Sequence, residues 1–320
     1  MSGEFDLIRR FFARPAPEGF LGPGDDCALM PAEAGTELAV SADLLVEGRH
    51  FFSDVDPVSL GHKSLAVNLS DLAAMGARPL GCFLSLSLPR ADEYWLQGFS
   101  RGFHALAERH ACPLLGGDTV RSNRDTTIGV TVIGQLPAGS ALRRDAALAG
   151  DDVWISGELG AADVALRLLQ LRSAGDEALL AAARGALEWP QPQLALGQAL
   201  RGLAHAAIDV SDGLLQDLGH ILAASGCGAE LRYDAMPVAD CLLGLDAQLL
   251  RQAVLCGGDV YQLCFTASPQ ARPDIVRAAQ QAGAKVSRIG RTVAQPGLTV
   301  LDADGGPIVL TGNAGFDHFA

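Results

Sequence analysis

The stretch KSLAVNLSDLAAMGARP, residues 63–79, sets the first constraint on the fold. Its large apolar side chains recur at helical spacing and predict a helix with a buried face: Leu65, Leu69, Leu72 and Met75. The only ionisable side chain between Lys63 and Arg78 is Asp71. A buried carboxylate without a partner is costly, so this one should be neutralised, paired or bound to a metal ion.

The composition is that of a compact globular protein. The chain has 320 residues, of which 49% are hydrophobic and 19% charged. This length is enough for about two domains of ordinary size. A formal net charge of −13 argues against nucleic acid or an anionic membrane as the main partner.

The cysteines and the N-terminus bear on the cellular compartment. Seven scattered cysteines, none in a Cys-x-x-Cys pair, favour reduced thiols over zinc ribbons or a redox motif. The first residues, MSGEFDLIRRFF, lack the long apolar core of a signal peptide. The sequence contains no run of roughly 18 apolar residues that would predict a membrane span. We therefore expect a cytoplasmic protein with no membrane partner.

Strand-like and helix-like segments are mixed along the whole chain. The first half predicts strands at 37–43 and 127–136 and helices at 58–76 and 91–110. The second half predicts a strand and turn at 153–160, helices at 161–172 and 176–187, and a strand-turn-helix unit at 206–226. Residues 137–152 break the pattern, which places a domain boundary there. We expect an α/β (α+β) protein with domains at 1–137 and 148–320.

Aspartates gather where strand-like runs end in glycine, serine or threonine. They are Asp25, Asp26, Asp43, Asp118, Asp209 and Asp212. Any one of them is readily explained as a turn former or a helix cap. Together with Asp71 they favour a cleft into which a rigid scaffold presents carboxylates.

Carboxylates without a Cys/His ligand set favour Mg²⁺ over zinc or copper. Because Mg²⁺ usually takes one or two carboxylates and completes its shell with water and phosphate, several carboxylates suggest several ions and a polyphosphate. Ser64, Asn68 and Asp71 are spaced to share one helix face, which makes Asp71 a candidate ligand. The alternative is that Asp71 forms a salt bridge in an ordinary internal turn.

Common phosphate-binding motifs are missing. A P-loop requires a Gly-Lys pair, and the chain contains none. The protein-kinase signatures are also missing, and the glycines of ISGELGAA lack dinucleotide-binding spacing. Glycine turns such as Gly116-Gly117 can still bring backbone N–H groups to phosphate oxygens.

Taken in order, the motifs resemble the thiamine-monophosphate kinase family. That family lies in a superfamily with aminoimidazole-ribonucleotide synthetase and selenophosphate synthetase. The resemblance covers nearly the whole chain and rests on these segments: GEFDLIRRF, GDDCA, SADLLVEGRHF, NLSDLAAMGA, GGDT, DVSDGL, GGDVYQL and GFDHF. The combination of VEGRHF, NLSDLAAMGA and DVSDGL is highly specific.

The resemblance implies direct transfer of the ATP γ-phosphoryl group to thiamine monophosphate, with several Mg²⁺ ions. It implies a fold like aminoimidazole-ribonucleotide synthetase, with an N-terminal mixed-sheet domain that binds ATP and metal and forms a homodimer, and a C-terminal α/β domain. The implied metal positions are Asp25, Ser41, Ala42, Asp43, Asp71, Asp118, Asp209 and Asp212, with Asp71, Asp118 and Asp212 acting in catalysis. The implied nucleotide contacts are Gly117, Asp118, Arg144 and Ser211. The implied substrate contacts are His50, Asp259 and Phe316.

Three departures from the family pattern concern affinity more than reaction class. Ala42 stands where a threonine is usual, which leaves its backbone carbonyl as the possible ligand. The family segment Gly-Gly-Glu-Asp-Tyr-Glu-Leu reads GGDVYQL here, so Val260 and Gln262 replace two acids. Gln193 stands where an arginine is common.

The chemistry of the implied reaction agrees with these residue types. The acceptor is a phosphate oxygen with a second pKa near 6, so positioning and charge neutralisation should suffice without a strong base. Arg144 can donate charge-assisted hydrogen bonds to phosphate, and Phe316 can stack on the cationic thiazolium. His50 is alternatively a packed polar residue beside Phe51. Two other functions remain open, another ATP-using reaction of the superfamily and a non-catalytic MgATP-sensing dimer.

Overall fold

The structure is a computed structural model that describes residues 8–12, 14–15, 17–18, 33–171, 177–309 and 315–316. Asp25 and Asp26 lie outside these residues. The chain divides into two compact units. Unit 1 comprises residues up to Leu72 together with 77–139, and unit 2 comprises 73–76 and residues from Ser140 onward. The division at Gly139 falls inside the predicted boundary segment 137–152.

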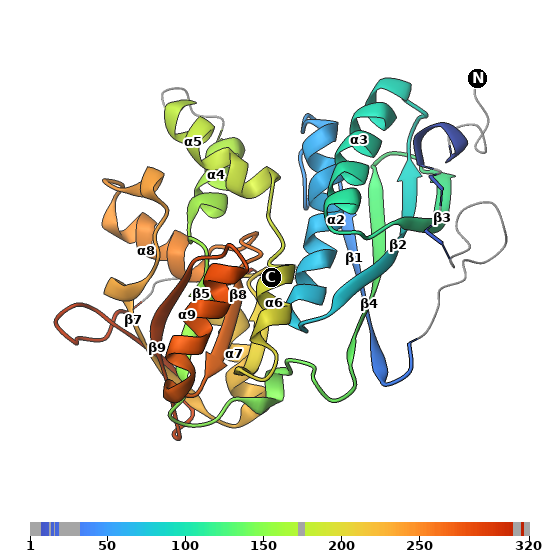
Figure 1. Cartoon of the computed structure of the whole chain (residues 1–320). Helices are drawn as coiled ribbons and strands as arrows, with labels where there is room; N and C mark the ends of the chain where they lie inside the picture. The colour runs from blue at the N-terminus through green and yellow to red at the C-terminus, as the bar shows by residue number, and fades with distance from the viewer. Residues whose placement is uncertain are drawn as a thin grey trace. The chain divides into compact units, whose positions relative to one another are not determined.

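Unit 1 is built on a four-stranded mixed sheet (Figure 1). Its strands, in spatial order, are β1 (Thr36–Val46), β4 (Thr127–Pro137), β2 (Arg78–Leu88) and β3 (Leu114–Arg121). The β1–β4 and β4–β2 pairs are antiparallel, whereas the β2–β3 pair is parallel. The predicted mixed-sheet N-terminal domain is therefore confirmed, and its predicted strands at 37–43 and 127–136 lie within β1 and β4.

Two long helices, α2 (Pro57–Ala74) and α3 (Glu93–Arg109), pack together in unit 1 with the short N-terminal helix η1 (Ile8–Phe12). The helices come very close, because a Cβ built at Gly61 would collide with the Phe99 carbonyl oxygen and one at Gly102 with that of Val58. Three residues of the predicted apolar stripe of α2 are buried, with Leu65, Leu69 and Leu72 at most 1% exposed, whereas the fourth, Met75, follows the end of the helix and is half-buried. Gly61 and Gly102 therefore allow the two helices to pack closely against one another.

Unit 2 contains a six-stranded sheet. In spatial order its strands are β10 (Gly297–Leu301), β7 (Gly228–Arg232), β9 (Val286–Val293), β5 (Asp152–Ser156), β8 (Leu263–Ala267) and β6 (Ala204–Asp209). Only the β10–β7 pair is parallel. The helices are α4 (Ala161–Leu171), α5 (Glu177–Glu188), α6 (Leu194–Leu200), α7 (Leu214–Ser225), α8 (Ala247–Cys256) and α9 (Arg272–Gln281). Short 3₁₀ turns lie at Arg144–Ala146, Tyr233–Ala235, Asp240–Leu242 and Pro269–Ala271.

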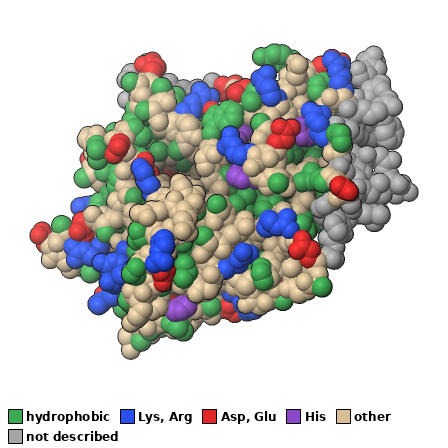
Figure 2. All heavy atoms as spheres, viewed as in Figure 1, with side chains coloured by type: hydrophobic (Ala, Val, Ile, Leu, Met, Phe, Trp, Pro, Cys, Tyr) green, Lys and Arg blue, Asp and Glu red, His purple; other side chains and the backbone are tan. Residues whose placement is uncertain are grey.

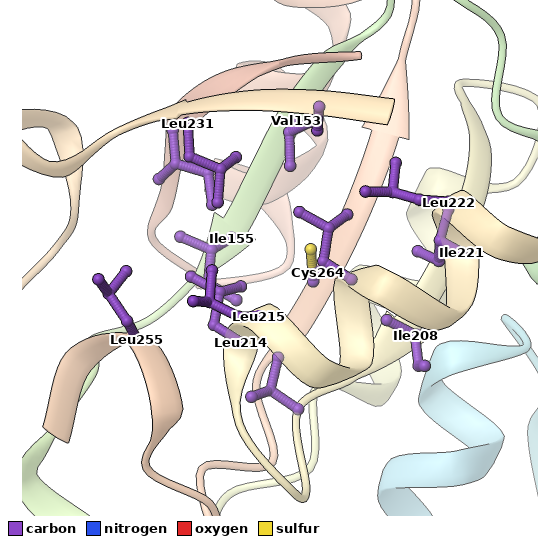
Figure 3. Packing of buried hydrophobic residues seen from close by; sticks show 14 of the residues in the cluster. Val153, Ile155, Ile208, Leu214, Leu215, Ile221, Leu222, Leu231, Leu255 and Cys264 are labelled. Carbon is purple, nitrogen blue, oxygen red and sulfur yellow. The ribbon is translucent and has the colours of Figure 1, made fainter. Parts of the chain in front are cut away.

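Helix α7 is the centre of the unit 2 core (Figure 3). This helix lies within the strand-turn-helix unit predicted at 206–226, and Leu214, Leu218 and Ile221 on it are fully buried. They pack with residues of β5, β6 and β8, among them Ile155, Ile208 and Cys264. Because α7 is fixed over most of its length, the loop that leads into it has a fixed anchor.

Helices in the described ranges are too short or too polar to cross a membrane. On the face drawn in Figure 2, basic side chains are spread over the surface and interspersed with acidic ones.

Candidate active site

In unit 1, strand β1 and helix α2 bring two of the predicted carboxylates together. Asp43 lies on β1 and Asp71 lies near the end of α2. The Ser41 hydroxyl donates a 2.5 Å hydrogen bond to Asp71 Oδ2, and the Asp43 backbone N–H donates a 3.0 Å bond to Asn68 Oδ1. These two bonds fix the helix on the strand and set the Ser41, Asp43 and Asp71 side chains at one place.

The two carboxylates repel one another. Burial, and secondly the charge of Asp71, raises the pKa of Asp43 to about 6 from an ordinary value of 3.8. Holding both groups ionised at neutral pH therefore costs free energy, which a bound cation would recover. The pair is a carboxylate and hydroxyl cluster suited to a hard divalent ion.

The sequence interpretation of α2 needs two corrections. Asp71 is not the buried carboxylate that the apolar helix suggested, because it lies near the end of α2 and its side chain is only partly buried. Ser64 does not join Asn68 and Asp71 at the site, because its buried hydroxyl donates to the Leu60 carbonyl at 2.7 Å. Helical spacing placed these residues on one face correctly, but it does not report where a hydroxyl points.

Asp118 lies elsewhere on the sheet. Its strand, β3, is separated from β1 by β4 and β2, which corresponds to about 14 Å at ordinary strand spacing. Strand pairing connects Asp118 through Ser85 and Gly129 to Leu44, the residue after Asp43. Since opposed residues share a face and successive ones alternate, Asp118 and Asp43 lie on opposite faces. Unit 1 by itself does not bring them together, and the described residues contain no cluster of three His, Cys, Asp or Glu side chains suited to a metal.

Three further predicted positions of unit 1 have defined environments. Gly117 has φ +154° and lies so close to β2 that a Cβ would collide with the Leu84 carbonyl oxygen, so glycine is required there. His50 Nδ1 accepts the Val46 N–H at 3.0 Å, which places the proton of the neutral ring on Nε2. Ala42 is exposed on the face of β1 opposite Asp43.

In unit 2, the loop between β6 and α7 carries the second predicted group of residues. Asp209 ends β6 and is 5% exposed, and Ser211 and Asp212 follow it. The carboxylate of Asp217, one turn into α7, accepts the backbone N–H groups of Ser211, Asp212 and Gly213 at 3.0, 3.0 and 3.1 Å. These three amides are thus engaged within the protein, and Ser211 has its hydroxyl left to offer a ligand.

Asp217 was missed by the sequence interpretation. Burial raises the pKa of its carboxyl to about 6, although the three N–H donors act in the opposite direction. The signal was an acidic residue in the first turn of a helix, where it can bind the orphan amide groups. The sequence alone did not distinguish this role from an ordinary surface charge.

The GGDVYQL segment, residues 257–263, lies against the same loop. Asp259 N–H donates to the Ser211 carbonyl and Tyr261 N–H to the Val210 carbonyl, both at 2.7 Å. Asp259 and Tyr261 have φ values of +59° and +51°, which are unfavourable for residues with a side chain. The Tyr261 hydroxyl donates to Asp259 Oδ1 at 3.1 Å. The strained backbone and this bond together fix the direction of the Asp259 carboxylate.

The C-terminal residues Gly315 and Phe316 reach the same place. Phe316 N–H donates to the Asp212 carbonyl at 3.0 Å, and the Phe316 side chain is 42% exposed. Three segments that are far apart in sequence therefore meet in unit 2, and two predicted substrate residues, Asp259 and Phe316, lie there with Asp212. The sequence did not predict this meeting.

Arg144 is exposed and lies apart from this cluster. Its carbonyl accepts the hydroxyl of Ser225, the last residue of α7, at 2.8 Å. Ser211 and Asp212 precede the first residue of the same helix, about 18 Å away at 1.5 Å per residue. The two predicted nucleotide contacts of unit 2, Arg144 and Ser211, therefore lie at opposite ends of α7.

The remaining departures from the family pattern have local explanations. Gln262 Oε1 accepts the Ser156 hydroxyl at 2.7 Å, a bond that a glutamate could also accept. Val260 packs at the edge of the unit 2 core. Gln193 precedes α6, and its side chain donates to the Gln191 carbonyl at 3.0 Å.

Comparison with known proteins identifies the class. Family models for the AIR synthase related protein N-terminal and C-terminal domains match residues 24–136 and 149–303. The chain is thus a two-domain member of the AIR synthase related proteins.

Full-length relatives identify the family within that class. Thiamine-monophosphate kinases from Salmonella typhimurium (strain LT2) and Escherichia coli (strain K12) are 44% and 42% identical, and each match covers 99% of this chain and 98% of the relative. The crystal structure of thiamine-monophosphate kinase from Stenotrophomonas maltophilia K279a matches at TM-score 0.83 and 45% identity, covering 90% of this chain and 92% of that one. AaThiL complexed with AMPPCP and TMP matches at TM-score 0.78 and 27% identity, covering 91% and 90%. The chain belongs to the thiamine-monophosphate kinase family.

The raised pKa of Asp43 predicts how stability depends on pH in metal-free protein. The folded state binds this proton more tightly than the unfolded state, so the free energy of unfolding should fall as pH rises from about 4 to about 6. Asp43→Asn removes this loss. At pH 7, in chelator, the variant should be more stable than wild type by about 2–3 kcal/mol, and the difference should vanish near pH 4.

Urea unfolding over this pH range measures the effect. Asp304→Asn, at an exposed position of unit 2, is the matched control and should follow wild type. An Asp43→Asn protein with the pH profile of wild type would contradict the proposed repulsion between Asp43 and Asp71.

Proposed function

We propose that this chain catalyses the Mg²⁺-dependent transfer of the ATP γ-phosphoryl group to thiamine monophosphate, giving thiamine diphosphate and ADP. The observation that carries the proposal is the Asp43–Asp71 pair, which holds two carboxylates together at a cost in the metal-free protein. A bound cation would offset this cost. The choice of substrates rests on the relatives: they are thiamine-monophosphate kinases, and one solved structure is of AaThiL complexed with AMPPCP and TMP.

The donor set fits Mg²⁺. Ser41, Asp43 and Asp71 offer carboxylate and hydroxyl oxygens, the ligand type that this ion prefers. We assign metal binding to these residues and, on the family resemblance, to Asp25, the Ala42 carbonyl, Asp118, Asp209 and Asp212. When bound, Mg²⁺ neutralises charge on the phosphate oxygens and polarises the transferring group.

The other residues position the two substrates. We assign ATP contacts to Gly117, Asp118, Ser211 and Arg144, and thiamine-monophosphate contacts to His50, Asp259 and Phe316. Near neutral pH the acceptor phosphate is largely deprotonated, so no residue needs to act as a strong base. Asp71, Asp118 and Asp212 would then serve catalysis by holding the Mg²⁺ ions that neutralise the phosphate charge. Asp259 and Phe316 hold the cationic thiazolium by charge and by stacking.

We further propose that two copies of the chain form a homodimer. One face of the unit 1 sheet exposes large apolar side chains of β1 and β3, with exposed fractions between 51% and 63%: Leu38, Val40, Leu44 and Val120. Apolar patches on a sheet face are typical of protein interfaces. We propose that a second copy of the chain covers this face.

We also propose that the protein acts in the cytoplasm. The six cysteines in the described part of the chain are free thiols, as expected in a reducing compartment.

The first test is a direct assay. With ATP, Mg²⁺ and thiamine monophosphate, the wild-type protein should form thiamine diphosphate and ADP in equal amounts, as followed by chromatography. Asp71→Asn should fold but lose nearly all turnover, roughly 10²-fold or more, because one charge at the metal site is removed. Asp304→Asn is again the matched control and should retain wild-type activity.

The same assay separates the alternatives. ATP binding without turnover would favour a MgATP-sensing dimer, and ATP use with an acceptor other than thiamine monophosphate would favour another reaction of the superfamily. An Asp71→Asn enzyme that retains the wild-type rate at half-saturating Mg²⁺ would show that Asp71 is not a ligand.

The dimer has its own test. Val40 lies in the exposed row of β1, so Val40→Lys places a charge in the proposed interface and should weaken association at least roughly tenfold. Sedimentation over a range of concentrations measures this. Val276→Lys, at an exposed apolar position on α9, should leave association unchanged. A wild-type protein of single-chain mass at every concentration would contradict the proposal.

A further inference from the structure

Gln216, in the first turn of α7, makes two hydrogen bonds with the same side-chain nitrogen. Its Nε2 lies 3.2 Å from Asp212 Oδ2 and 2.9 Å from the Phe316 carbonyl oxygen. A side-chain amide nitrogen carries two hydrogens, so both are used. One amide group thus binds a carboxylate assigned to metal and a backbone group of a residue assigned to substrate.

The C-terminal segment is docked onto this turn by further contacts. Phe316 N–H donates to the Asp212 carbonyl at 3.0 Å. A Cβ built at Gly315 would collide with Gln216 Oε1, so the backbone passes directly over the Gln216 side chain. Residues 315–316 therefore pack against the Gln216 side chain and accept a hydrogen bond from it.

Other groups already hold the turn itself. Asp217 binds the three amides of residues 211–213, and the segment containing Asp259 pairs with Ser211. Removal of the Gln216 amide therefore leaves the Ser211–Gly213 backbone in place. What it releases is the direction of the Asp212 carboxylate and the hydrogen bond to the carbonyl of Phe316, whose N–H remains bonded to Asp212 and whose side chain is 42% exposed.

We infer that Gln216 is a positioning residue that couples Phe316 to Asp212. By fixing the Phe316 backbone it holds the aromatic ring for the cationic ring of the substrate, and by binding Asp212 it ties that ring to the metal end of the site. The inference rests on the proposed function and adds to it a determinant of specificity for a cationic phosphate ester. It assigns Gln216 no contact with the reacting atoms.

Two substitutions separate the hydrogen bonds from the shape of the side chain. Gln216→Leu keeps most of the volume and removes both donors. Gln216→Glu keeps the shape but replaces both donors by acceptors, and it places a second charge beside Asp212. Gln216→Glu should therefore be the more damaging of the two.

The decisive experiment is a double-mutant cycle on the KM for thiamine monophosphate. Gln216→Leu and Phe316→Ala should each raise this KM roughly tenfold, whereas the KM for ATP should change less than about threefold. If Gln216 acts through Phe316, then Phe316→Ala should raise KM less than about twofold in the Gln216→Leu background. Gln280→Leu, on the exposed side of α9, is the matched control and should change neither constant.

Each outcome has a definite meaning. Fold-changes that multiply in the double mutant, or a Gln216→Leu enzyme with the wild-type KM, would overturn the inference. If Gln216→Leu does not fold, Gln216→Asn removes the same contacts, because its amide is one methylene short of both acceptors, and it is held to the same criteria. A wild-type protein that forms no thiamine diphosphate would refute the proposed function itself, a result distinct from these.

Discussion

The attachment of α2 to β1 is the constraint on which the site depends. Asn68 accepts a hydrogen bond from the Asp43 backbone N–H, and Asp71 accepts one from the Ser41 hydroxyl. The two bonds that join helix and strand therefore also bring the Asp43 and Asp71 carboxylates together. Burial of the leucine face of α2 stabilises this arrangement against the repulsion that raises the pKa of Asp43. Unit 1 thus uses the free energy of its core to maintain a charge arrangement that is unfavourable without a cation.

Unit 2 holds the side chains of its loop residues in a fixed direction. Asp217 satisfies three amides of the turn that carries Ser211 and Asp212, and the strained residues Asp259 and Tyr261 lie against it. Strain of this kind persists only where neighbouring structure determines it, and it is common at functional sites. The buried helix α7 supplies that support, because its position is fixed by the core beneath it.

Much of the fold and the identity of the site segments could be predicted from the sequence. Apolar spacing located α2 and α7, and glycine and aspartate marked the loops that meet in unit 2. Three features could not be predicted, because they depend on strand register or on the direction in which a side chain points, and residue spacing reports neither. Strand register places Asp118 on the opposite face of the sheet from Asp43. Asp217 accepts hydrogen bonds from the backbone N–H groups of the turn at residues 211–213. The Ser64 hydroxyl bonds to a carbonyl of its own helix instead of facing the site.

The central claim is that the carboxylates of this chain require a divalent cation before the protein can bind a polyphosphate. Calorimetric titration of wild-type protein with ATP, once in chelator and once with Mg²⁺, tests it most directly. Two like-charged groups already in place should repel the nucleotide, so binding in chelator should be weak and binding with Mg²⁺ at least roughly tenfold tighter. Equal affinity for ATP in the two conditions would contradict the account.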